Sequence, residues 1–141
     1  MNRRGFTLLE TLIVLAIMGI VMGSGYALLR PMLDRNRLEN ATTQVATDLM
    51  RVRSYAQRSN HIACWMRLDD RRYRLNLGGT IHDYSLPEGL VFTSPSVGAV
   101  IRYRPPYGEL NASAKTVAVQ DAKGRTRTLH IVGVTGKVIY P

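Results

Sequence analysis

Residues 6–29 form an apolar stretch whose only ionisable side chains are Glu10 and the weakly acidic Tyr26. As a helix rising about 1.5 Å per residue, this stretch is long enough to cross a bilayer core of roughly 30 Å. Arg3 and Arg4 precede it, and basic residues before a span favour a cytoplasmic N-terminus. The sequence therefore predicts one membrane-spanning helix, with the remainder of the chain outside the cytoplasm.

Two other interpretations of this segment are a secretory signal peptide and an ordinary signal anchor. Gly25, Tyr26 and Ala27 form a small-x-small sequence of the kind that signal peptidase cleaves. The apolar stretch continues to Leu29, however, and it exceeds the roughly 7–15 apolar residues of a secretory signal. A signal anchor on a domain unrelated to filaments stays a distant alternative.

Glu10 is the residue that these two interpretations do not explain. It lies inside the apolar stretch, four residues after Phe6. A carboxylate at the centre of a bilayer costs roughly 2.5–3.5 kcal/mol, and less near the end of a span. Because ionisable groups at such positions are rare and usually functional, the sequence predicts a functional role and a partner for Glu10.

The first ten residues read MNRRGFTLLE, which resembles the class III signal of type IV pilins and type II secretion pseudopilins. The resemblance implies that prepilin peptidase cleaves after Gly5 and that the new N-terminus, Phe6, is methylated. It also implies that Glu10 pairs with the N-terminal amine of a neighbouring pilin or pseudopilin subunit. That amine would be the missing partner of the carboxylate, and a buried pair of this kind would fix the axial register of the subunits.

An amphipathic helix is predicted to follow the apolar stretch over residues 30–60. Its apolar positions recur at steps of three and four, which places them on one face of a helix: Leu38, Ala41, Val45, Leu49, Val52 and Ala56. Polar residues, including Asp48, are expected to lie off this face. The helix is expected to end near Ser59 and Asn60.

From residue 61 onward the apolar residues alternate with polar ones, and turn residues recur at intervals, which indicates β-strands. The predicted strands are 61–68, 71–77, 80–85, 90–93, 97–104, 115–121, 126–134 and 137–140, with residues 105–108 as a loop. In the first strand the even positions, including Cys64, are expected to face the core. A long helix followed by an antiparallel sheet is an α+β architecture.

Two further segments indicate which subfamily of these proteins the chain resembles. Residues 49–60 read LMRVRSYAQRSN and residues 131–138 read IVGVTGKV, which resemble the helix end and the closing strands of the H-type minor pseudopilin family. That family includes minor pilins of type IV pili. The usual Gly-Arg of the closing turn is Gly136 and Lys137 here. The resemblance implies a minor pilin or pseudopilin.

A second hypothesis is that this chain is a minor pilin that binds DNA in natural transformation. The chain has a formal net charge of +9, and basic surfaces suit anionic partners. If Asp69 and Asp70 form the turn of a hairpin, Arg67 lies opposite Arg72 on its outer face. The predicted contacts, with the tryptophan as a stacking group, are Trp65, Arg67, Arg72, Arg74, Arg102, Arg104 and Lys137. A solvated basic face, or contacts to filament neighbours, is the simpler explanation.

No pattern in the sequence predicts an enzyme, a cofactor or a metal site. The histidines, His61, His82 and His130, are dispersed without metal-ligand spacing. Cys64 is the only cysteine, so it cannot form a disulfide within the chain.

The sequence thus predicts a precursor of the inner membrane with four segments. These are a leader at 1–5, a transmembrane helix at 6–29, an amphipathic helix at 30–60 and an antiparallel β domain at 61–141. The expected partners are prepilin peptidase, the membrane and other filament subunits, with DNA as the alternative partner. Sequence does not distinguish a role in secretion from one in twitching or competence.

Overall fold

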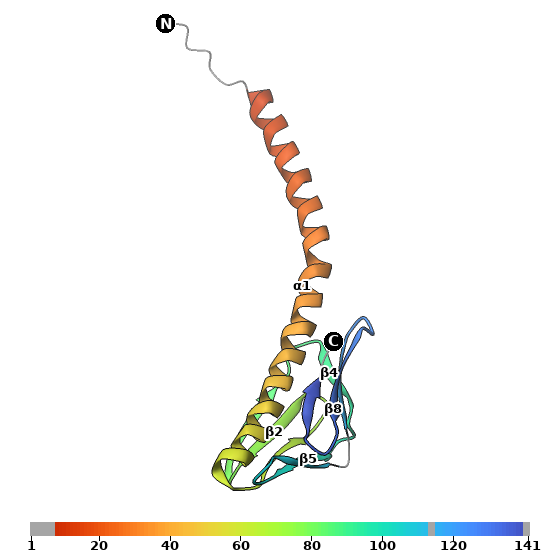
Figure 1. The fold of residues 1–141 in the computed structure, drawn as a ribbon. Helices are drawn as coiled ribbons and strands as arrows, with labels where there is room; N and C mark the ends of the chain where they lie inside the picture. The colour runs from red at the N-terminus through yellow and green to blue at the C-terminus, as the bar shows by residue number, and fades with distance from the viewer. Residues whose placement is uncertain (1–7, 113–114, 140–141) are drawn as a thin grey trace, which may run out of the picture. The chain divides into compact units, whose positions relative to one another are not determined.

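The computed structural model describes residues 8–112 and 115–139, except the side chains of residues 24 and 26–29. The chain divides into two compact units, Met1–Asn36 and Arg37–Pro141. Figure 1 shows one helix followed by strands along the chain. Their bounds are α1 Leu8–Ser59, β1 Ala63–Arg67, β2 Arg72–Leu77, β3 Thr80–Ser85, β4 Leu90–Ser94, β5 Val100–Arg104, β6 Glu109–Ala112, β7 Thr116–Asp121, β8 Thr126–Val132 and β9 Lys137–Ile139.

Helix α1 contains Pro31 and ends where the sequence predicted. Asn60, the residue after the helix, has a φ of 55°. A left-handed residue at this position is a common way to end a helix, and asparagine tolerates that conformation better than most residues.

In the part of the chain that the structure describes, no helix is both long and apolar enough to cross a membrane.

The predicted apolar face of the helix is confirmed, since Leu38, Ala41, Val45, Leu49, Val52 and Ala56 are all buried in the core. The expectation for Asp48 is wrong, because this carboxylate is also buried. The hydroxyl of Tyr73 donates a hydrogen bond to Asp48 Oδ2 at 2.6 Å. A buried carboxylate is tolerated when it is hydrogen-bonded, so helix and sheet are joined by a polar contact inside the core. Burial, together with this hydrogen bond, raises the pKa of Tyr73.

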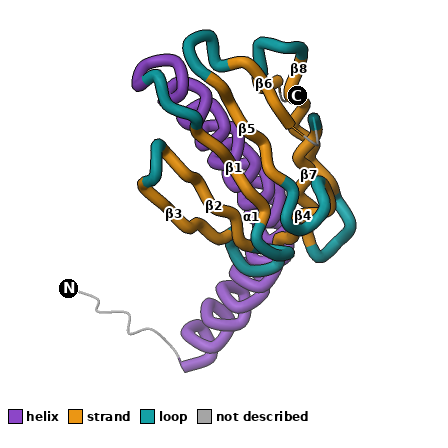
Figure 2. The backbone as a smooth tube through the Cα atoms, turned by 90° about the horizontal axis from the view of Figure 1, so that it is seen from below, coloured by secondary structure: helices purple, strands orange, loops and turns teal. Residues whose placement is uncertain are grey.

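The strands form two antiparallel sheets. The first sheet has the order β3-β2-β1-β5-β6 and the second has the order β4-β7-β8-β9. In Figure 2, β1, β2 and β5 lie across the C-terminal half of α1, and β4 and β7 lie to one side of them. One apolar cluster contains buried residues from the helix and from both sheets. The α+β class is therefore confirmed, with two sheets in place of a single one.

Strand β6 is not among the strands that the sequence predicts. Its residues, 109–112, read ELNA, and only Leu110 and Ala112 face the core side of the sheet. The strand forms by pairing with β5, with Tyr103 opposite Leu110 and Arg104 opposite Glu109. A segment with so little β propensity is recruited by tertiary pairing rather than by its own sequence.

The predicted pairing of β1 with β2 is wrong by one residue. Cys64 lies opposite Asn76 and Trp65 opposite Leu75. The last paired residues before the turn are Leu68 and Arg72. The N–H of Leu68 donates a hydrogen bond to the carbonyl oxygen of Arg72 at 2.9 Å. The turn therefore spans residues 69–71, one residue more than expected. A shift of one residue moves every side chain of a strand to the opposite face.

As a consequence, the odd positions of β1 face the core. Ala63, Trp65 and Arg67 are buried, whereas Cys64 is half-buried on the outer side, which corrects the prediction for this cysteine. Burial raises the pKa of the Cys64 thiol, partly opposed by the nearby charge of Arg102.

Candidate functional site

The predicted assembly site lies at the start of the chain. Gly5 and Phe6, the predicted cleavage and methylation residues, lie outside the described residues. Glu10 is exposed and belongs to the first turn of α1. A carboxylate at this position interacts favourably with the helix dipole. The roles of Gly5, Phe6 and Glu10 stay predictions.

Trp65, the predicted stacking group, is completely buried. Its ring stacks on Tyr73 at 5.7 Å between centroids and meets Phe92 edge-on at 5.8 Å. Placing this ring on the outer face was therefore an error. An indole enclosed by aromatic neighbours holds the core together and has no free face for a nucleotide base.

Arg67 is also buried, with 6% of its side chain exposed. Its guanidinium donates to the carbonyl oxygens of Asp69 and Pro95 and to Asp70 Oδ1, the last at 2.8 Å. It also lies 5.8 Å from the centre of the Phe92 ring, a cation–π distance. Because all its nitrogens are used within the fold, Arg67 serves the β1–β2 turn, and its predicted outward position is wrong.

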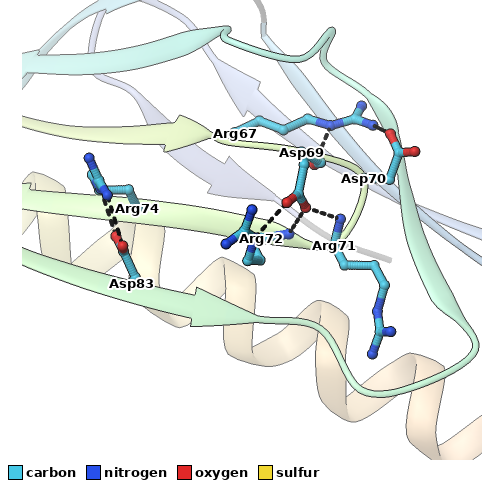
Figure 3. Close-up of polar contacts among 7 residues, drawn as sticks. All are labelled: Arg67, Asp69, Asp70, Arg71, Arg72, Arg74 and Asp83. Carbon is cyan, nitrogen blue, oxygen red and sulfur yellow. Dashed lines mark hydrogen bonds and ion pairs between the residues drawn. The ribbon is translucent and has the colours of Figure 1, made fainter.

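Arg72 and Arg74 do lie on the outer side of the first sheet, and each has an acidic neighbour (Figure 3). Arg72 Nε is 2.5 Å from Asp69 Oδ2, and Arg74 makes two bonds of 2.6 and 2.8 Å to Asp83. The paired arginine lowers the pKa of the Asp83 carboxyl. In the pairing of β1 with β2, Arg74 lies opposite Met66. These two ion pairs neutralise much of the positive charge that was expected on the outer face of the first sheet.

Asp69 stabilises the β1–β2 turn through hydrogen bonds of its carboxylate, and this role can be tested by the pH dependence of stability. Its Oδ1 accepts the backbone N–H groups of Arg71 and Arg72 at 2.8 and 2.7 Å. These bonds, led by that of Arg71, and the Arg72 side chain lower the pKa of Asp69 from 3.8 to about 2.

A carboxyl with a lowered pKa stabilises the fold above its unfolded pKa, and this stabilisation is lost as the pH falls through the folded pKa. Between about pH 4 and pH 2, we therefore expect the unfolding midpoint of the wild type to fall more steeply than that of Asp69→Asn. The amide keeps an acceptor oxygen but has no charge. The measurement is denaturation of the full chain in detergent, followed by the fluorescence of Trp65. Parallel pH profiles for the two chains would contradict this assignment.

Three of the predicted contact residues, Arg102, Arg104 and Lys137, are exposed as expected. Arg102 and Arg104 alternate with the buried residues Ile101 and Tyr103 along β5. Lys137 begins β9 in the second sheet. The structure thus places Arg102 and Arg104 on the same outer face of the first sheet as Arg72 and Arg74. Trp65 and Arg67 are buried, and Lys137 lies in the second sheet.

The C-terminal turn, which was singled out by resemblance, contacts the end of α1. Arg53 Nε donates to the carbonyl oxygen of Thr135 at 2.8 Å. Tyr103 donates to the carbonyl oxygen of Gly136 at 3.3 Å, and the N–H of Leu110 donates to that of Val134 at 2.8 Å. These bonds connect the β8–β9 turn with the helix and with the first sheet. Apart from the two segments that carry the resemblance, no local pattern of residues indicates this contact.

Within residues 8–112 and 115–139, no group of three or more His, Cys, Asp or Glu side chains could hold a metal ion.

Comparison with known proteins identifies the N-terminal segment. The prokaryotic N-terminal methylation motif matches residues 1–26. Pilin-like protein PilA1 of Thermus thermophilus is 45% identical over 60 residues. The chain is type IV pilin-like. The aligned region covers 43% of this chain and 37% of PilA1, so the pilin-like chain spans well under two thirds of that relative. No solved structure matches this chain.

Proposed function

We propose that this pilin-like chain is a minor pilin or pseudopilin, a structural subunit of a type IV pilus or a type II secretion pseudopilus. The observation that carries the proposal is the methylation motif over residues 1–26. In this proposal, prepilin peptidase cleaves the precursor between Gly5 and Phe6, and Phe6 is then methylated. Residues 6–29 insert once into the inner membrane, with the N-terminus cytoplasmic and the β domain outside the cytoplasm.

The mechanism is assembly rather than catalysis. Cleavage exposes a positively charged amine at Phe6, and the carboxylate of Glu10 in a neighbouring subunit pairs with it. In a surrounding of low dielectric, two such charges attract each other far more strongly than in water. The helices then form the interior of the filament, and the β domains form its outer surface.

Processing of the N-terminus provides the direct test. The full chain is produced together with a prepilin peptidase, and the mature protein is sequenced from its N-terminus. We expect sequence beginning at Phe6 with a methylated amine. Gly5→Gln is expected to abolish cleavage, whereas Glu10→Val is the matched control because it leaves the residues on both sides of the cleaved bond, Gly5 and Phe6, unchanged. A mature chain that begins at Met1 or after Ala27 would refute the proposal.

DNA binding is a second candidate function, favoured by the two arginines that β5 displays side by side, Arg102 and Arg104. This candidate predicts that the full chain in detergent retards DNA in a gel at physiological salt. It also predicts that the double change Arg102→Gln and Arg104→Gln lowers the slope of log affinity against log salt by about 0.9 for each lost phosphate contact. Unaltered DNA mobility at micromolar protein would exclude it.

A further inference from the structure

A groove lies between helix α1 and the end of strand β3, within the unit Arg37–Pro141. Its volume is about 360 Å³, which falls within the roughly 300–1,000 Å³ of pockets that hold small ligands. Its walls include Arg37, Ala41, Gln44, Tyr73, Ser85 and Leu86. Among the described residues that line it, none belongs to the predicted DNA contacts, so the groove is a separate feature of the domain.

The floor of the groove is apolar. Ala41 is 5% exposed, Leu86 3% and Tyr73 2%. The hydroxyl of Tyr73 and the side-chain amide of Gln44 both donate to Asp48 Oδ2, at 2.6 and 3.3 Å. Because these polar groups already have a partner inside the fold, an apolar ligand can fill the groove without leaving them unsatisfied.

Two guanidinium groups lie at the edge of this apolar floor. Arg37 lines the groove and is exposed. Arg71 donates to the carbonyl oxygen of Leu86 at 3.2 Å, and in Figure 3 its side chain extends away from Asp69 and Asp70. Among the residues that the structure describes, no carboxylate forms an ion pair with either arginine. The groove thus combines an apolar floor with positive charge that the fold does not neutralise.

A second hollow, of about 470 Å³, adjoins the groove at Ser85, which lines both. Arg71 lines this second hollow as well, together with the β1–β2 turn. The two aspartates of that turn, Asp69 and Asp70, are engaged by Arg72 and Arg67. The two hollows together therefore suit a molecule that has an apolar chain next to an anionic polar group.

The position of the groove along the chain indicates where such a molecule comes from. The predicted span ends at Leu29, and Arg37 follows eight residues later in α1, which is a rise of about 12 Å. The head-group layer on each side of a bilayer is about 5–8 Å thick. In a precursor inserted in the membrane, phospholipids are therefore the amphiphilic molecules closest along the chain to the groove.

We propose that this groove takes up an acyl chain of an anionic phospholipid, whose phosphate group binds Arg37 and Arg71. Hydrogen bonds between guanidinium and phosphate groups are charge-assisted and stronger than neutral ones. The inference rests on the proposed function, because it requires that residues 6–29 insert into the membrane. It goes beyond that function, since the bound lipid holds the domain at the membrane surface until the subunit enters a filament.

Quenching of tryptophan fluorescence by brominated lipids tests this inference. The full chain is inserted into vesicles of equal amounts of phosphatidylcholine and phosphatidylglycerol, with bromine on the acyl chains of one lipid or the other. Trp65 is the only tryptophan and is completely buried, and its ring lies 5.7 Å from that of Tyr73 in the groove. Bromine quenches an indole only at close range. We expect at least threefold more quenching by brominated phosphatidylglycerol than by brominated phosphatidylcholine. Equal quenching by both lipids, or none by either, would overturn the inference.

Removal of the two charges provides a second measurement. The double change Arg37→Gln and Arg71→Gln keeps hydrogen-bond donors but no charge, and is expected to abolish the preference for phosphatidylglycerol. The matched control is Arg102→Gln with Arg104→Gln, two exposed arginines of β5, which is expected to keep it. Trp65 emission in vesicles without bromine verifies that each variant is folded. An unchanged preference in the folded Arg37 and Arg71 variant would also overturn the inference.

Flotation of the same vesicles separates the two possible failures. A chain that floats with the vesicles but shows no selective quenching refutes only the inference. A chain that does not float refutes the membrane insertion in the proposed function, and the inference with it.

Discussion

Replacing Gly136 with alanine is expected to lower the free energy of unfolding by about 2–5 kcal/mol. Gly136 has a φ of 64°, and a Cβ atom at this position would lie 2.4 Å from Cε1 of Tyr103. Left-handed backbone costs an L-residue about 1–2 kcal/mol, and forcing an extra methyl group into a packed region typically costs about 1–3 kcal/mol more. The Tyr103 ring is fully buried, so it has little room to move away.

Gly133 is the matched control, since it lies in the same connection between β8 and β9. Its φ is 68°, nearly that of Gly136, but an added Cβ would come no closer than 3.9 Å to a neighbouring atom. Gly133→Ala is therefore expected to cost only the backbone contribution, about 1–2 kcal/mol. Both variants are measured by denaturation of the full chain in detergent, with the fluorescence of Trp65, its only tryptophan. Equal losses would show that the contact with Tyr103 does not limit residue 136.

The second large effect is expected for Arg67→Met, which keeps an apolar chain and removes the guanidinium. The carbonyl oxygens of Asp69 and Pro95 then lose their donor, and an unsatisfied buried polar group costs about 1–3 kcal/mol. We expect a total loss of about 2–4 kcal/mol. Removing the positive charge of Arg67 from beside Asp70 adds little to this loss of stability, because the Asp70 side chain is 77% exposed and stays solvated.

Arg102→Met is the control for Arg67→Met, because it makes the same chemical change at an exposed position. Substitutions at such positions usually alter stability by no more than about 0.5 kcal/mol. The same denaturation experiment compares the two variants. If the two changes had equal effects, Arg67 would not hold the β1–β2 turn in the way that its contacts indicate.

The helix and most strand positions were predictable because their signals are local. The recurrence of Leu38, Val45 and Leu49 at helical spacing predicts one buried face, and all three are buried. The alternation along β5 likewise predicted that Arg102 and Arg104 point outward. Strand β6 has no comparable signal, since its pairing with β5 is a tertiary contact.

The candidate basic surface was less predictable because both faces of β1 carry apolar residues. Cys64 and Met66 alternate with Ala63 and Trp65, so periodicity does not decide which pair faces the core. A buried arginine at position 67 also contradicts the usual placement of charge. It is tolerated because Asp70 and two backbone carbonyl groups satisfy its guanidinium.

By itself, the sequence determined the prepilin-type N-terminus, the helix with its buried face, and the α+β class, because each depends on residues close together in the chain. Only the tertiary structure decided the register of β1 with β2, the burial of Trp65 and Arg67, and the contact of the C-terminal turn with Arg53. The register depends on whether a turn contains one more residue, and burial depends on which face fits against the helix and the second sheet. Both are settled by packing between segments distant in sequence, which local patterns do not encode.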